Sequence, residues 1–198
     1  DFAPTFLDAA GVKVPADMSG GSLLSILRSE KNGSVDTKRD HVIFGKERHT
    51  PCQETGELSA PCRAIRTKEF LYIHNFYADR WPAGAPKGER RSDWGDCDAG
   101  PTKTEILKNR TTAQGKKFYQ LCFDKRPQDE LYDVQKDPHQ MHNLAADPEY
   151  ATQLQKLREQ LMSELRASGD LRMQGKGDVY ESFPYLGRGS KARNKKKK

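Results

Sequence analysis

The chain has 198 residues, with 34 Lys and Arg against 28 Asp and Glu, 34% hydrophobic residues and four cysteines. No run approaches the roughly 18 apolar residues that cross a bilayer, and the N-terminus lacks the charged, apolar and small-residue order of a signal peptide. Charged residues make up 31% of the chain and are balanced in sign, which favours a soluble, folded stretch over a disordered one. Because the chain opens at Asp1 and not at a methionine, we expect this residue to be a cut within a longer protein.

The positive charge gathers at the C-terminal end. Residues 188–198 hold seven Lys and Arg and no acid, and without them 27 basic residues face 28 acidic ones, a net charge of −1. Such a run predicts a solvated, disordered terminus, with contact to a polyanion or a membrane surface as the alternative. No zinc finger, helix-turn-helix or aromatic RNA-binding signature accompanies it, so we expect no nucleic-acid partner.

Two short helices and a strand are predicted near the N-terminus. Residues 4–10 (PTFLDAA) are typical of a helix with a proline in its first turn, and Gly11 can adopt the left-handed cap. The apolar face of this helix consists of Phe2, Phe6, Leu7 and Ala10. Ser22 is a candidate N-cap for a second helix that ends at Leu27. The apolar run 41–45 (HVIFG) predicts a buried strand that ends just before a charged cluster.

An antiparallel sheet is predicted in the middle of the chain. Residues 63–66 and 70–74 have the length and the β-branched and aromatic composition of a hairpin, and residues 130–134 predict a further strand. Between them, residues 77–104 are dense in Pro, Gly and Asp, which predicts a long loop.

The clearest helix pattern covers residues 147–167. Asp147 can cap it, Pro148 takes the first helical position, and Gly169 follows its end. Its apolar stripe consists of Tyr150, Leu154, Leu157, Leu161 and Leu165. We expect this stripe to pack on the sheet.

The cysteines and histidines give no metal signature. The four cysteines are too widely spaced for a zinc ribbon, and both disulfides and free thiols remain open for them. They are Cys52, Cys62, Cys97 and Cys122. His139 and His142 are three residues apart, but no acidic or thiol partner is near them in the sequence, so exposed turn histidines are the simpler interpretation.

A charged cluster follows the first predicted strand. It consists of Glu47, Arg48 and His49. A guanidinium and an imidazole at a strand end suit an anionic, oxygen-rich ligand, because both donate charge-assisted hydrogen bonds. A solvated strand edge is the alternative. The loop 79–103 is a second candidate for the rim of such a site.

Short motifs follow one another in a fixed order along residues 1–167. They are 1–11 (DFAPTFLDAAG), 21–24 (GSLL), 63–67 (RAIRT), 70–73 (FLYI), 130–134 (ELYDV), 136–138 (KDP) and 143–145 (NLA). In this order they resemble the sulfatase family of the alkaline-phosphatase-like superfamily. The first two are similar to the stretch D-x-x-P-T-x-L-D-x-A-G and G-x-S-L-x-x-x-L, and the others to the family's C-terminal subdomain. Segments 46–49, 79–84 and 100–103 look most like the branch related to heparan N-sulfatases (N-sulfoglucosamine sulfohydrolases).

The resemblance implies hydrolysis of a sulfate ester or sulfamate by a formylglycine hydrate. A calcium ion held by carboxylate and amide oxygens would neutralise the sulfate, as suits a hard cation acting as a Lewis acid. In the family this machinery belongs to the N-terminal part, so we expect the calcium ligands and the formylglycine upstream of Asp1. Residues 62–66 (CRAIR) formally fit a formylglycine-generating pattern, C-x-A-x-R. They stand where the family has its C-terminal hairpin, so we interpret Cys62 as an ordinary strand cysteine.

We therefore expect an α/β fold in three parts. Residues 1–60 would end an alkaline-phosphatase-like α/β domain, residues 61–168 would form a small antiparallel sheet packed by a C-terminal helix, and residues 169–198 would form a tail with a basic end. The resemblance implies the C-terminal fragment of an exported sulfatase that acts on sulfated sugars, inactive without its N-terminal catalytic part. No catalytic or metal-binding residue is expected in the chain.

In this interpretation, Arg48 and His49 bind the sulfated saccharide and Glu47 orients them. Two other functions remain open: a phosphodiesterase or phosphonate hydrolase of the same superfamily, and a non-catalytic module that binds sulfated polysaccharide through Arg48, His49 and the lysine-rich tail. Arg63 and Arg66 alternate with apolar residues, so one face of the hairpin is polar and meets either solvent or another domain.

Overall fold

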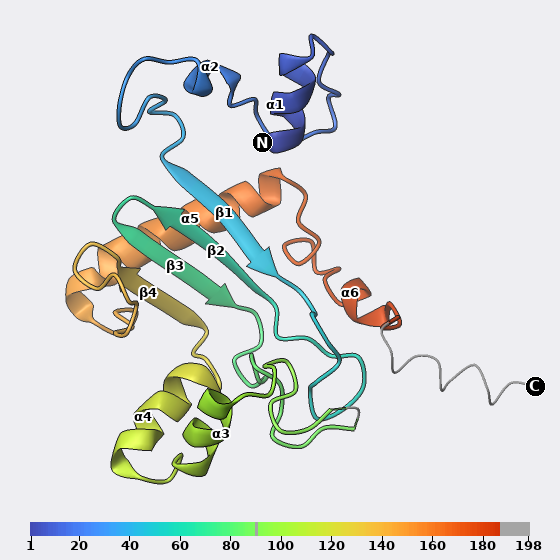
Figure 1. Ribbon diagram of the computed structural model, residues 1–198, viewed down its shortest axis with the longest axis vertical. Helices are drawn as coiled ribbons and strands as arrows, with labels where there is room; N and C mark the ends of the chain where they lie inside the picture. Colours follow the sequence, from blue (N-terminus) through green and yellow to red (C-terminus); the bar gives the residue numbers. More distant parts are fainter. Residues whose placement is uncertain (90, 187–198) are drawn as a thin grey trace, which may run out of the picture. The chain divides into compact units, whose positions relative to one another are not determined.

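The computed structural model describes residues 1–89 and 91–186. The protein consists of two compact units, Asp1–Asp40 and His41–Lys198. The basic run 188–198, for which a disordered terminus was predicted, lies outside the described residues. Figure 1 shows the helices and strands of both units in sequence colours.

The first unit contains the two predicted helices, α1 (Phe2–Ala9) and α2 (Leu24–Leu27). Side-chain hydrogen bonds join them. The Thr5 hydroxyl oxygen accepts from the backbone N–H of Leu23 at 2.8 Å, and the Ser22 hydroxyl donates to Asp8 Oδ2 at 2.6 Å. Ser22 Oγ also accepts from the N–H of Leu24 at 3.1 Å, but the N-cap position of α2 is Leu23, so the predicted cap is one residue too early.

The predicted apolar face of α1 is not covered within this unit. Phe2 and Phe6 are 75% and 70% exposed, whereas the buried residues of the helix are Pro4 and Thr5. The periodic pattern located the helix correctly, but two short helices offer too little apolar surface to bury both phenylalanine rings.

The second unit is built on a four-stranded antiparallel sheet in the order β1-β2-β3-β4 (Figure 1). The strands are β1 (His41–Lys46), β2 (Cys62–Thr67), β3 (Phe70–Asn75) and β4 (Asp129–Asp133). The predicted hairpin of β2 and β3 and the predicted strand β4 are confirmed. Ile43 of β1 pairs with Ile65 of β2, so the structure places β1 in this sheet, ahead of the domain boundary that we expected at residue 60.

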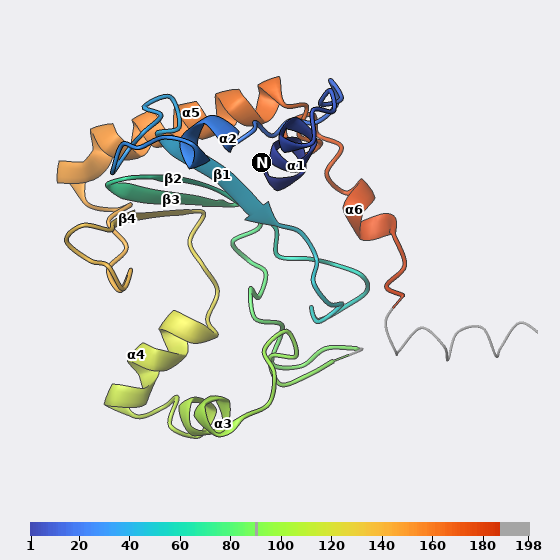
Figure 2. The same ribbon diagram turned by 45° about the horizontal axis from the view of Figure 1, so that its top comes forward.

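Helix α5 (Ala151–Ala167) covers one face of the sheet, as the apolar stripe predicted. It follows a short 3-10 helix, η1 (Pro148–Tyr150), and Asp147 Oδ1 caps this start by accepting from the N–H of Glu149. Figure 2 shows α5 running along the sheet, with α3 and α4 away from it.

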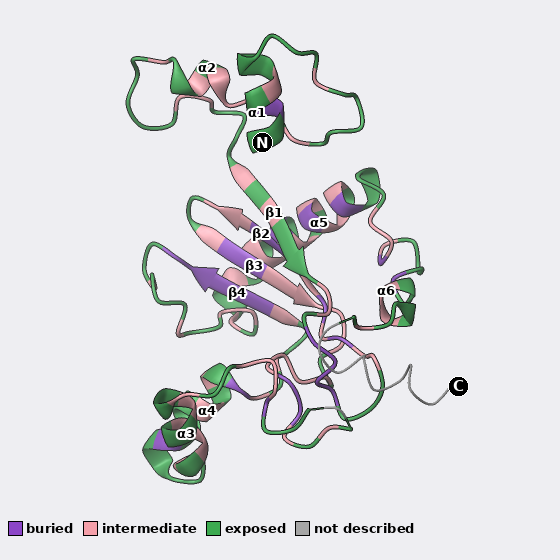
Figure 3. Ribbon diagram, turned by 45° about the vertical axis from the view of Figure 1, so that its right-hand side comes forward, coloured by how far each residue is buried: buried purple, intermediate pink, exposed green. Residues whose placement is uncertain are grey.

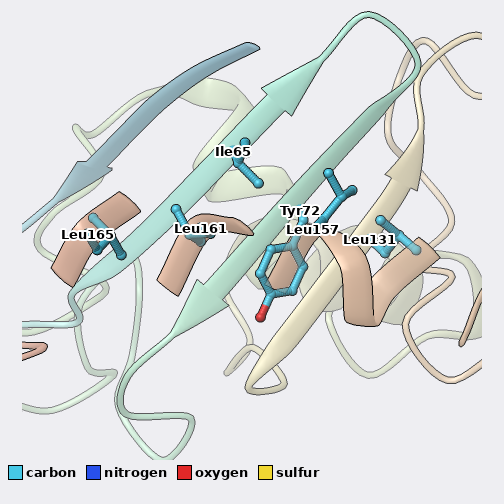
Figure 4. Packing of buried hydrophobic residues seen from close by; sticks show 6 residues of the cluster. All are labelled: Ile65, Tyr72, Leu131, Leu157, Leu161 and Leu165. Carbon is cyan, nitrogen blue, oxygen red and sulfur yellow. The ribbon is translucent and has the colours of Figure 1, made fainter. Parts of the chain in front are cut away.

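The core between α5 and the sheet consists of six side chains that are at most 4% exposed (Figure 4). They are Ile65, Tyr72, Leu131, Leu157, Leu161 and Leu165. Burying one such side chain stabilises a fold by about 1.5–3 kcal/mol. The predicted packing of a C-terminal helix on a small antiparallel sheet is therefore confirmed.

One polar cluster lies at the edge of this core. The Tyr72 hydroxyl donates to Asp129 Oδ1 at 2.6 Å, and the Arg158 guanidinium pairs with Asp129 Oδ2. Burial acts to raise the pKa of Asp129, but the hydrogen bonds from Tyr72 and His74 and the charge of Arg158 outweigh it and hold that pKa below its usual value.

The opposite face of the sheet is only partly covered. Ala64, Leu71, Tyr132 and Val134 form a second small apolar cluster there. On the edge strand β1, Val42 and Phe44 are 54% and 50% exposed. Figure 3 shows the contrast between the mostly exposed β1 and the buried stretches of β3 and β4.

Two helices between β3 and β4 had not been predicted: α3 (Pro101–Lys108) and α4 (Ala113–Cys122). The loop predicted over residues 77–104 is therefore wrong from Pro101 onward, where Pro101 takes the first position of α3. Helix α4 begins after Thr112, whose hydroxyl accepts from the N–H of Gly115 at 3.0 Å. A last short helix, α6 (Val179–Ser182), follows α5.

Candidate functional site at the end of strand β1

The three predicted site residues leave strand β1 in different directions. Arg48 is held by protein groups: its Nη1 donates to Glu57 Oε2 at 2.8 Å and its Nη2 to the carbonyl oxygen of Phe183 at 2.6 Å. Its side chain is 10% exposed. The guanidinium thus ties the segment after β1 to the end of the described chain.

Glu47 belongs to a largely buried ion cluster. Its Oε1 accepts from Arg63 Nη2 at 2.7 Å and its Oε2 from Arg172 Nη2 at 2.6 Å, while Arg63 Nε donates to Asp170 Oδ2 at 2.8 Å. These contacts are with Arg63 and Arg172 and not with Arg48 or His49. Arg63, for which solvent or another domain was expected, is 9% exposed and lies inside the fold.

The carboxylates of this cluster outweigh the effect of burial on the pKa of its two arginines. Burial acts against the charge of Arg63, but hydrogen bonds and ion pairs with Asp170 and Glu47 outweigh it and raise the pKa of its guanidinium. Burial acts in the same way on Arg172, and Glu47 again raises the pKa above its ordinary value. The two guanidinium groups therefore keep their charge although they are largely buried.

His49 faces outward and has a carboxylate behind it. Its Nδ1 lies 2.6 Å from Asp96 Oδ1, and its side chain is 75% exposed. An ionised carboxylate can only accept, so Nδ1 donates the hydrogen bond and the ring plane is fixed. Nε2, on the far side of the ring, then points toward solvent.

Asp96 gathers two further groups beside His49. The Thr50 hydroxyl donates to Asp96 Oδ1 at 3.0 Å, and Lys46 Nζ lies 3.9 Å from Asp96 Oδ2. Lys46 Nζ also donates to the carbonyl oxygen of Pro82 at 2.9 Å. An imidazole and an ammonium group thus stand on either side of one carboxylate, and the predicted loop 79–103 contributes that carboxylate.

The loop that carries Asp96 is held rigidly. Lys103 Nζ donates to the carbonyl oxygens of Trp94 and Cys97 at 2.9 and 2.7 Å. Trp94 has a φ of 53°, a left-handed conformation that tertiary contacts must maintain. Gly84, at φ 91°, is needed because a Cβ there would lie 2.9 Å from the backbone N of Gly95.

No pattern in the sequence identifies these partners directly. Asp96 is one of several acidic residues in its loop, and Lys103 lies in helix α3, which was not predicted, so only the fold selects them. Arg172 and Asp170 come from residues after α5, which had been assigned to a tail. The concentration of Asp, Gly and Pro between residues 77 and 104 predicted a long loop, and residues 79–103 were the second candidate for the rim of the site.

The cysteines and histidines do not form a metal site. Within residues 1–89 and 91–186 no group of three or more His, Cys, Asp or Glu side chains is placed to hold a metal ion. The four cysteines are free thiols. Burial raises the pKa of the Cys52 thiol, and the charge of Asp96 adds to this effect. Cys62 lies in β2, paired with Lys46 of β1 and Asn75 of β3.

Comparison with known proteins shows that the chain is similar to sulfatases. The family model described as N-sulphoglucosamine sulphohydrolase, C-terminal, matches residues 1–83. An ulvan-active sulfatase from Formosa agariphila is 27% identical over 176 residues, which cover 86% of this chain and 29% of that protein. Human N-sulphoglucosamine sulphohydrolase is 28% identical over 172 residues, which cover 81% of this chain and 30% of that protein. The chain is thus similar to the C-terminal region of sulfatases.

The chain is also similar to a solved structure. It is described as a complex with its substrate D-glucosamine-2-N,6-O-disulfate, and it matches with a TM-score of 0.51 and 26% identity over 86% of this chain and 24% of that one. The sulfatase region spans between 24% and 30% of the length of these three proteins. In the described part of the chain, no helix combines the length and the apolar character that a membrane span needs.

Proposed function

We propose that the protein containing this chain hydrolyses sulfate groups on sugars, and that His49 is the chain's contact with the sulfated substrate. The observation that supports the activity is the match to sulfatases over more than four-fifths of the chain. Because the chain spans less than a third of those relatives, the proposal places the calcium ligands and the formylglycine on residues outside it. It also includes export of the protein, by the family resemblance alone.

The geometry of His49 supports its role. A sulfate oxygen accepts a hydrogen bond from Nε2 when the His49 ring is an imidazolium, and a sugar hydroxyl donates one to Nε2 when the ring is neutral. Asp96 determines which ring nitrogen carries its hydrogen, and Thr50 and Lys46 in turn fix Asp96. The ammonium group of Lys46 adds positive charge where an anionic sugar would approach.

In this proposal, Arg48 and Glu47 stabilise the end of strand β1 through contacts with other protein groups. The Arg48 guanidinium is occupied by Glu57 and Phe183, and the Glu47 carboxylate is occupied by two arginines. Direct contact of Arg48 with the substrate stays a prediction. A change to Arg48 in the complete protein that lowered kcat/KM tens-fold without lowering stability would support it.

The test of His49 compares two histidines in the complete protein. His49→Ala should lower kcat/KM for release of sulfate by about 10- to 150-fold, the value of one hydrogen bond to a charged group. His142→Ala is the matched control, because His142 is 74% exposed and its Nδ1 lies 3.5 Å from Asp137 Oδ2. Equal kinetics for both variants would remove His49 from the site.

A further inference from the structure

A cavity of about 510 Å³ lies on the face of the sheet opposite α5. Ile73 and Tyr132 belong to the strands that line it, and Leu121 at the end of α4 and the turn 139–141 also line it. Its volume falls within the range of about 300–1,000 Å³ that is usual for small-molecule sites. It lies entirely within the second unit.

The charged groups in this cavity are mostly positive. Among the described residues, Lys46, Arg80 and Arg126 line it together with one carboxylate, Glu130. Glu130 is 5% exposed, and its two oxygens accept from Asn75 Nδ2 at 2.8 Å and from the Tyr132 hydroxyl at 2.6 Å. Both oxygens of the Glu130 carboxylate therefore already accept hydrogen bonds from neighbouring side chains. The lining of the cavity has an excess of positive charge.

Arg126 is the cation best placed to take a ligand. Arg80 is committed to Glu181 and to the carbonyl oxygen of Ser59. Arg126 is only partly exposed and donates to one carbonyl oxygen, that of Leu121 at the end of α4. A guanidinium has five N–H donors, so the remaining ones suit a sulfate or carboxylate group in bidentate geometry.

The cavity adjoins the His49 site. Lys46 and Pro82 line both this cavity and the small hollow that contains His49. Asp96 joins the two places, with one oxygen on His49 and the other 3.9 Å from Lys46 Nζ. A saccharide longer than one unit that is bound at His49 could therefore extend past Lys46 into the cavity.

We propose that this cavity is a subsite for an anionic sugar unit, carrying a sulfate or a carboxylate, that neighbours the unit whose sulfate is removed. Arg126 binds the anionic group, and Asn75 and Tyr132 at the floor limit how deeply the ring enters. The proposal rests on the proposed function and names its substrate class, an oligosaccharide with charge on adjacent units. This cavity would then determine the length of oligosaccharide that the protein prefers.

The test uses the complete protein with D-glucosamine-2-N,6-O-disulfate as the single unit and a heparin-derived tetrasaccharide as the longer probe. Arg126→Gln should raise KM for the tetrasaccharide at least tenfold and leave kcat/KM for the single unit unchanged. Arg110→Gln is the matched control, because exposed Arg110 likewise donates to a helix carbonyl oxygen, that of Leu107, but lies outside the cavity. Binding of the tetrasaccharide is measured in parallel by calorimetry.

The outcomes separate the two proposals. The subsite is supported if Arg126→Gln raises KM for the tetrasaccharide, leaves kcat/KM for the single unit unchanged, and Arg110→Gln changes neither. Equal losses on both probes, or no loss on either, would overturn it. If the wild-type protein releases sulfate from neither probe, the proposed function fails for these sugars, and calorimetry then decides the subsite. In that case, the subsite is supported if Arg126→Gln weakens tetrasaccharide binding at least tenfold and Arg110→Gln does not. The subsite is overturned if the tetrasaccharide does not bind, or if Arg126→Gln leaves its binding unchanged.

Discussion

Replacing Glu47 by glutamine should destabilise the sheet strongly, although the side chain keeps its shape. The amide removes the negative charge that faces Arg63 and Arg172, whose side chains are 10% and 3% exposed. Removing one partner of a buried ion pair costs about 3–5 kcal/mol. Glu47 is 24% exposed and Arg63 keeps Asp170, so we expect a smaller loss, of about 2–3 kcal/mol.

The suitable assay is hydrogen exchange of the β1 and β2 amides in the complete protein, because it reports the local opening of this sheet. A loss of that size corresponds to exchange about 30- to 150-fold faster. Glu159→Gln, at an exposed position on α5, should change exchange little. The double variant Glu47→Gln with Arg172→Met should recover part of the loss, since no buried guanidinium then lacks its carboxylate. Acceleration below threefold in Glu47→Gln would refute the assignment of Glu47 to a buried ion cluster.

Three further outcomes follow from the core, the polar cluster and the thiols. Leu161→Ala, at a side chain that is 0% exposed, should lower the stability of the second unit by roughly 2–4 kcal/mol in urea unfolding, and a loss under 1 kcal/mol would contradict the packing. The lowered pKa of Asp129 means that its contact with Tyr72 stabilises the fold above about pH 4 and that this contribution is lost as the pH falls through the folded-state pKa. Asp129→Asn should therefore flatten the acid side of a stability profile, and an unchanged slope would contradict the role of this carboxylate. Iodoacetamide at neutral pH should label exposed Cys122 well before buried Cys52, whose thiol pKa is raised, and mass spectrometry of short time points would show a reversed order if the burial were wrong.

The parts of the fold that could be predicted are those fixed by local patterns. The leucine stripe of α5 follows from a period of 3.6 residues, and the hairpin of β2 and β3 follows from two β-rich runs joined by a short connection. Helix α4 was missed because it is only ten residues long and contains Gly115, a poor helix former, near its start. The pairing of β1 with β2 joins residues across a long loop, which local patterns do not encode.

The candidate site, like the fold, could be predicted only in part. The pattern identified Glu47, Arg48 and His49 as one cluster at a strand end, and the structure confirms that all three follow β1 directly. Side chains of successive residues point in different directions, so the cluster separates into a buried carboxylate, a tied guanidinium and an exposed imidazole. The partner that orients the His49 ring is Asp96. Which of the acidic residues in this loop takes that position depends on tertiary packing.

The central claim concerns the group that the complete protein removes. The most direct measurement compares initial rates of sulfate release from a panel of sulfated sugars, including D-glucosamine-2-N,6-O-disulfate, with rates on a phosphodiester and on a phosphonate ester. We predict release of sulfate from at least one sugar, reduced at least tenfold by His49→Ala, with slower reaction of the phosphorus esters. Hydrolysis of the phosphodiester or phosphonate without release of sulfate would contradict it and favour the other hydrolases of the superfamily.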